Sequence, residues 1–148
     1  MFRPIATATV LAGTLDILSA FVWSDAVVAV LRTVASGPLG DDMAASSAGA
    51  PLGLLVHFAI MAAMVTAFML AAKRVPALTQ RWIVAGLFYG LALWIVMYWI
   101  VMPLRWDSYR TPSDVLPILQ QLISHCLLTG LPIAWVAARR PPLGLRRL

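Results

Sequence analysis

Charged residues are scarce in this chain of 148 residues: they make up 11% of it, whereas apolar residues make up 61%. A soluble domain is about 25% charged, and the eleven basic and six acidic residues present here could not cover its surface. A disordered chain is also excluded, because such chains are poor in apolar residues and rich in charge. The single cysteine, Cys126, leaves no disulfide framework and no thiolate metal cluster. The class that remains is an integral membrane protein.

Four apolar runs are long enough to cross a membrane. A helix needs about 20 apolar residues to span the hydrocarbon core, and the runs cover about residues 5–23, 51–72, 82–102 and 115–138. Transmembrane β-strands would be half as long and would alternate in polarity. The sequence therefore predicts an all-α integral membrane protein, one domain over residues 1–148, in which four transmembrane helices form a compact bundle.

The connections carry further predictions. Residues 24–50 form the longest loop, and its 25–35 segment is predicted to be a short helix that lies at the outer membrane interface or tucks back against the bundle. Turns are predicted to follow it from Ser36 to Gly40. Pro103 is expected to end the third span, and Pro132 is expected to kink the fourth. The first run also has some features of a cleaved signal peptide, but Asp16 interrupts it, which favours a retained helix.

The basic residues are distributed unevenly about these spans. With four crossings, eight of the eleven cations fall on the side of both termini, while the other three share the opposite side with five aspartates. The eight are Arg3, Lys73, Arg74, Arg81, Arg139, Arg140, Arg146 and Arg147. Because basic loops stay in the cytoplasm, both termini are predicted to be cytoplasmic, with 139–148 as a basic tail. Lipids are the expected partners, and nucleic acid is not, since no basic soluble domain exists.

Ionisable side chains within the spans are the candidate functional residues, because burying one without a partner is costly. Asp16, His57 and His125 lie in three different spans, and Tyr98 lies in the other. At 1.5 Å per residue, all four fall roughly 8–15 Å below the outer ends of their helices. Near the same layer, the fourth span adds polar side chains that could support such a site: Gln120, Gln121 and Ser124.

Several interpretations of this polar layer remain open. The aspartate could share a proton or a hydrogen bond with a histidine and only fix the helix register. It could instead form a proton-responsive site with a histidine that exchanges a proton near neutral pH. His57 and His125 could also hold a b-type haem, or join Asp16 in a metal site. The sequence favours neither a resident metal nor a cofactor, and the haem is the weaker alternative.

Certain short segments resemble a known family. They are Gly13–Asp16 in the first span, Leu55–Phe58 and Ala72–Pro76 around the second, Gly86–Gly90 and Met102–Pro103 in the third, and His125 with Ala138–Arg140 in the fourth. Over residues 51–140 and this first motif, the chain is similar to the small bacterial inner-membrane proteins of the YagU-like family. The resemblance implies a bacterial inner-membrane location and an association with acid survival.

Two functions follow as expectations. The first is a small inner-membrane protein that supports envelope or proton homeostasis through the Asp/His layer, alone or as a homo-oligomer. The second is an accessory or haem-carrying subunit of a larger membrane complex. An enzyme is not expected, because the sequence contains no nucleophile–base pair, phosphate loop or zinc motif.

Overall fold

The computed structural model describes residues 2–139, and these form helices and connections without any strand. Four helical stretches are long and apolar enough to cross a membrane, as the sequence predicts. The first two are α1 (Phe2–Val22) and α3 (Gly49–Arg74). The third is made of α5 (Trp82–Ile95), η2 (Val96–Val101) and α6 (Met102–Arg105). The fourth is made of α7 (Val115–Leu122), η3 (Ile123–Gly130) and α8 (Leu131–Ala138).

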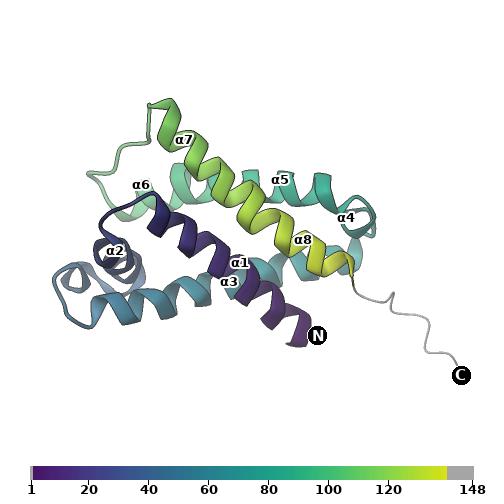
Figure 1. Ribbon diagram of the computed structural model, residues 1–148, viewed down its shortest axis with the longest axis horizontal. Coiled ribbons are helices and arrows are strands. Elements are labelled where there is room, and N and C mark those ends of the chain that lie inside the picture. The colour runs from purple at the N-terminus through teal and green to yellow at the C-terminus, as the bar shows by residue number, and fades with distance from the viewer. Residues whose placement is uncertain (1, 140–148) are drawn as a thin grey trace, which may run out of the picture.

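The connections gather at two ends of the bundle (Figure 1). The short helix α4 (Ala77–Gln80) lies at the same end as the start of α1 and the close of α8. At the other end lie α2 (Val27–Leu39), the short 3₁₀ helix η1 (Asp41–Ala44) and α6. We call the end that contains α4 and the start of α1 the terminal end, and the opposite end, which contains α2, the α2 end. Of the predicted basic tail, only Arg139 belongs to the described residues, and its guanidinium lies 3.9 Å from the centre of the Trp135 ring.

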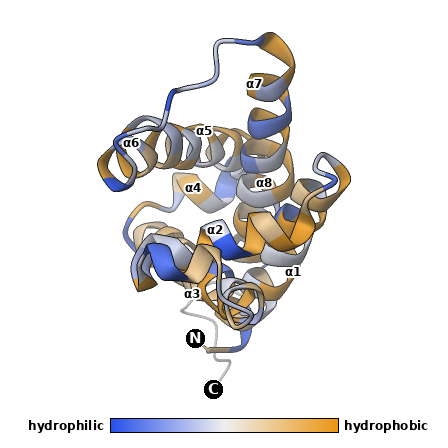
Figure 2. Ribbon diagram, turned by 90° about the vertical axis from the view of Figure 1, so that its left-hand side faces the viewer, coloured by the Kyte–Doolittle hydropathy of each residue, from blue (hydrophilic) through white to orange (hydrophobic). Residues whose placement is uncertain are grey.

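The tightly packed core lies toward the terminal end. It is built from small residues of α1, large residues of α3 and the last turns of α8: Ala8, Ala12, Met61, Val65, Phe68, Met69, Ile133, Ala134, Val136 and Ala137. Many other large apolar side chains are exposed on all four spans, and Figure 2 shows apolar colouring along these helices. In water such a surface would be unstable, whereas in a bilayer it faces lipid chains of matching polarity.

Glycines let the third and fourth spans approach each other at backbone distance. A Cβ atom on Gly86 would lie 2.9 Å from the carbonyl oxygen of Gly130, and one on Gly90 would overlap the backbone of His125 and Cys126. Without these side chains, the helices pack through van der Waals contact in the way common to membrane helices. This contact sets His125 beside the third span.

Pro103 does not end the third span, contrary to the prediction. The helix widens into the π-helical segment η2, passes through Pro103 and continues to Arg105. The fourth span repeats this pattern, because the π-helical segment η3 ends two residues before Pro132. A proline lacks an N–H and its ring crowds the carbonyl four residues earlier, and a π turn is one of the adjustments by which membrane helices absorb this defect.

The turns predicted from Ser36 to Gly40 are also wrong, because α2 continues through Pro38 to Leu39. Arg105 stabilises this last turn from the end of the third span. Its guanidinium donates hydrogen bonds to the carbonyl oxygens of Gly37 (Nε, 2.7 Å) and Ser36 (Nη2, 2.7 Å), and to a carboxylate oxygen of Asp41 (Nη2, 2.6 Å). Carbonyls at a helix C-terminus have no partners within the helix, so Arg105 caps α2 and ties it to the third span.

We expect Arg105→Ala to lower the free energy of unfolding in detergent by about 2 kcal/mol, since bonds from a charged donor contribute about 1.5–3 kcal/mol. Asp41→Ala is the matched control. The Asp41 side chain is 78% exposed, and exposed ion pairs contribute only about 0–1 kcal/mol. Denaturation titrations of both variants provide the measurement. Equal losses in the two variants would show that the ion pair, and not the capping of α2, holds this end together.

Candidate functional site

Asp16 lies at the junction of two cavities near the α2 end, about two thirds of the way along α1. Its Oδ1 atom accepts hydrogen bonds from the Ser124 hydroxyl at 2.6 Å and the Thr129 hydroxyl at 3.2 Å. Both donors are buried, with 7% and 1% of their surfaces exposed. The carboxyl group is therefore held between the first and fourth spans by two hydroxyl donors.

The π-helical segment η3 makes this arrangement possible. Ser124 and Thr129 are five residues apart, and a five-residue step on an α-helix would turn them to different faces. A π helix closes its hydrogen bonds at that same five-residue interval, so residues five apart lie nearly above one another. Both hydroxyls consequently reach one oxygen of Asp16.

Ser19 joins the network one turn later on α1. Its hydroxyl oxygen lies 2.7 Å from the Asp16 carbonyl oxygen and 2.8 Å from the Ser124 hydroxyl oxygen. Because Ser124 donates its proton to Oδ1 of Asp16, the single proton of Ser19 goes to one of these two oxygens at a time. Ser19 is 7% exposed. A hydrogen-bond network of this kind fixes the rotation of α1 relative to η3, because a rotation of either helix would leave buried polar groups without partners.

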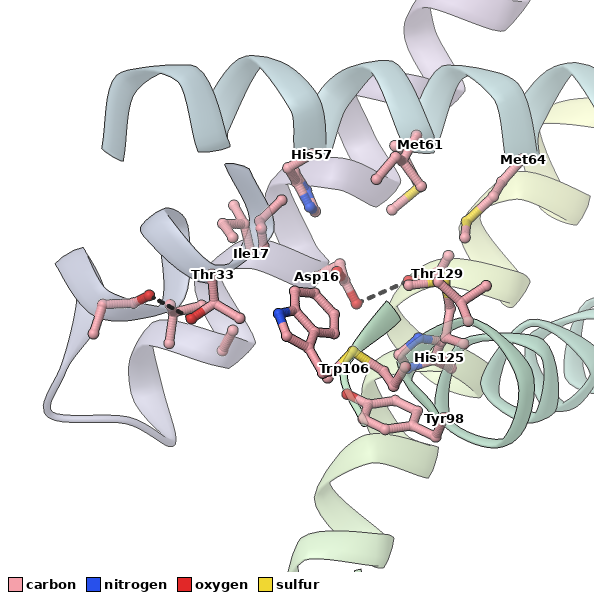
Figure 3. A pocket seen from close by; sticks show the side chains of 18 of the residues that line it. Asp16, Ile17, Thr33, His57, Met61, Met64, Tyr98, Trp106, His125 and Thr129 are labelled. Atoms are coloured by element: carbon pink, nitrogen blue, oxygen red, sulfur yellow. Dashed lines mark hydrogen bonds between the residues drawn. The ribbon is translucent and has the colours of Figure 1, made fainter. Parts of the chain in front are cut away.

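The first cavity has a volume of about 460 Å³ and brings together all four predicted candidates: Asp16, His57, Tyr98 and His125. Its walls come from α1, α2, α3, η2 and η3, and most of its lining is apolar. Figure 3 shows the side chains of His57, Met61 and Met64 entering it from α3, across from Tyr98 and His125. Several of the residues that line the cavity are exposed, among them Ile60 on α3, Val101 on η2 and Ala29 on α2.

The second cavity, about 330 Å³, lies on the other side of Asp16 and contains the three predicted supporting residues, Gln120, Gln121 and Ser124. Ser19 and Ser24 add hydroxyl groups to its lining. The Gln121 side-chain oxygen accepts a hydrogen bond from the Trp94 indole at 3.0 Å. Asp16, Tyr98 and His125 line both cavities.

Neither histidine is hydrogen-bonded to Asp16 in the described part of the chain, so the proposed sharing of a proton or hydrogen bond between them is not what the structure contains. The Nε2–H of His57 donates to the Gly13 carbonyl oxygen at 2.9 Å, and the Nδ1–H of His125 donates to the Gln121 carbonyl oxygen at 3.0 Å. A carbonyl oxygen only accepts, so these bonds fix the protonated nitrogens. They leave Nδ1 of His57 and Nε2 of His125 as the other ring nitrogens.

These tautomers bear on the haem and metal alternatives. His57 would have to give up its bond to Gly13 before its Nε2 could bind an iron, whereas the Nε2 of His125 makes no hydrogen bond within residues 2–139. Within the same residues, no group of three or more His, Cys, Asp or Glu side chains could hold a metal ion.

Two contributors were not recognised as site residues in the sequence. Thr129 could have been found from its position four residues after His125, which places both on one helical face. Trp106 lines the first cavity at the edge of α2 and carries the Arg105 guanidinium 5.0 Å from its ring centre. The sequence indicated only that this tryptophan lay near a span end, and nothing local shows that α2 folds back against it.

Comparison with known proteins gave no match to a family, to a curated protein or to a solved structure. The resemblance to YagU-like proteins thus stays a prediction. The fold by itself defines the class: a helical protein with four helices suited to crossing a membrane, and with cavities on both sides of an aspartate in the first.

Proposed function

We propose that this protein binds an amphiphilic small molecule inside the membrane and thereby supports envelope homeostasis. The observation that carries the proposal is the first cavity, whose apolar lining surrounds a small set of convergent polar groups from α1, α3, η2 and η3. An apolar pocket with few, fixed polar groups is the usual form of a small-molecule site.

The position of the cavity favours ligand binding over a purely structural role. The packed core occupies the terminal end of the bundle, whereas the α2 end contains two cavities around one carboxyl group. A polar layer that only fixed register would be expected to fill its space, because voids beside polar groups cost stability. A haem-carrying subunit remains the second candidate, but the bond between His57 and Gly13 argues against it.

The same proposal includes the location and orientation. We infer a bacterial inner-membrane protein with both termini in the cytoplasm, α2 at the outer interface and no enzymatic activity of its own, acting alone, as a homo-oligomer or with a membrane partner. The terminal end carries Arg3, Lys73, Arg74 and Arg81, as the positive-inside rule requires of the cytoplasmic side.

A reporter fusion tests the orientation. Alkaline phosphatase fused after Leu148 should be inactive, and green fluorescent protein at the same position should fluoresce, because the C-terminus is predicted to stay in the cytoplasm. The same two reporters inserted after Asp107, in the connection between α6 and α7, should give the opposite pattern. Phosphatase activity at Leu148 would contradict the proposed topology.

Filling the cavity tests the ligand site. Val30 and Val28 both lie on α2, but Val30 lines the first cavity whereas Val28 does not and is 51% exposed. We expect native mass spectrometry of the detergent-purified protein to detect a bound amphiphile in the wild type and in Val28→Phe. The same molecule should be missing from Val30→Phe, whose larger ring occupies the cavity. Equal occupancy in both variants, or a wild type without bound molecules, would contradict the proposal.

A further inference from the structure

The first cavity contains one acidic side chain and no basic one among the described residues that line it. Asp16 uses Oδ1 for both of its hydroxyl donors, and Oδ2 receives no hydrogen bond from any side chain or backbone group within residues 2–139. An ionised carboxylate in an apolar wall needs a partner of opposite charge, since burial without one is costly. The protein itself supplies none inside this cavity.

The two histidines do not fill that role. Each already directs its N–H to a backbone carbonyl oxygen, of Gly13 or of Gln121. Neither Arg32 on α2 nor Arg105 is among the residues that line the cavity, and Arg105 pairs with Asp41. The position opposite Oδ2 is therefore open to a cation from outside the protein.

The rest of the lining suits an organic cation better than a metal ion. Trp106 and Tyr98 present aromatic rings to the cavity, and such rings attract cations through their negative faces. Four methionines, Met61, Met64, Met97 and Met102, supply flexible apolar contacts that adapt to ligands of varied shape. A small inorganic ion would find one carboxylate here and too few other oxygen ligands.

We propose that the ligand class of this site is a lipophilic organic cation, whose charge pairs with the Asp16 carboxylate while its apolar groups occupy the methionine-lined cavity. This inference rests on the proposed function and narrows it to one kind of amphiphile.

Two ions of the same shape and opposite charge test the proposal on the full chain. We would titrate tetraphenylphosphonium and tetraphenylborate into the protein in nonionic detergent by calorimetry, under one set of buffer conditions near neutral pH. The phosphonium should bind at least tenfold more tightly than the borate. In Asp16→Asn this preference should be lost, while Asp107→Asn, in an exposed connection, should behave as the wild type.

The outcomes separate this inference from the proposed function. Equal binding of both ions, or phosphonium binding that is unchanged in a folded Asp16→Asn, would overturn the cation assignment while the bound amphiphile of the Val30 experiment still stood. Absence of any binding together with an empty wild-type protein would overturn both. Because the wild type alone supplies the comparison of the two charges, failure of Asp16→Asn to fold leaves the proposal falsifiable.

Discussion

Gly90→Ala is expected to lower the free energy of unfolding by about 2–3 kcal/mol, the upper range for overpacking a tight interior. The added Cβ would overlap the His125 carbonyl group and lie 2.5 Å from the Cα of Cys126. Backbone atoms of a facing helix cannot rotate away as a side chain can, so the third and fourth spans would have to separate. A denaturant titration in detergent, followed by circular dichroism, measures the loss.

Gly37→Ala is the matched control for this prediction. The Cβ added there would meet only the Trp106 ring, at 3.7 Å, which is an ordinary contact distance. We expect a change of less than about 1 kcal/mol, the size of an intrinsic helix preference. If Gly90→Ala were as well tolerated as Gly37→Ala, the close contact between α5 and η3 would be wrong, and with it the placement of His125.

A second prediction concerns the energetic coupling between Asp16 and Thr129. In a double-mutant cycle of Asp16→Ala and Thr129→Val, we expect a coupling energy of about 1 kcal/mol, because each single change removes the same hydrogen bond. Thr129 is 1% exposed, and valine keeps its shape. Unfolding free energies of the four proteins, measured under one set of conditions, give the value.

The cycle of Asp16→Ala with His57→Ala provides the comparison. His57 is bonded to Gly13 and not to the carboxylate, so these two changes should add to within about 0.5 kcal/mol. Strong coupling to His57 and none to Thr129 would restore the aspartate–histidine pair and contradict the network described above.

The predictability of the fold follows from the physics of the bilayer. Long apolar runs have few stable alternatives to a spanning helix, since every backbone polar group must be satisfied within the segment. The bounds of the four spans therefore agree with the sequence to within three residues. The passage through Pro103 was missed because the π turn before it has no recognised sequence pattern.

The sequence allowed us to predict which residues form the candidate site, but not how they bond to one another. Asp16, His57, Tyr98 and His125 could be singled out because ionisable and polar groups are rare within spans, and they do line one cavity. Their bonding could not be predicted. The rotation of η3 that directs Ser124 and Thr129 at Asp16 depends on its π turns, and Gly13 accepts from His57 because a bare glycine lets α3 approach α1 closely. The position of Trp106 depends on how α2 folds back, which is a tertiary property.

The central claim is that α1 and η3 meet at Asp16 inside the bundle, and a disulfide tests it most directly. The hydroxyl oxygens of Ser19 and Ser124 are 2.8 Å apart, so cysteines at both positions can bond with little adjustment. We would place Ser19→Cys and Ser124→Cys in a Cys126→Ala background, with a protease site in α4, and oxidise the protein in membranes. After cleavage, the two halves should stay joined until a reductant is added, whereas Leu18→Cys with Ser124→Cys should fall apart. Separate halves in the Ser19 pair, with both cysteines still reactive toward maleimide, would contradict the account.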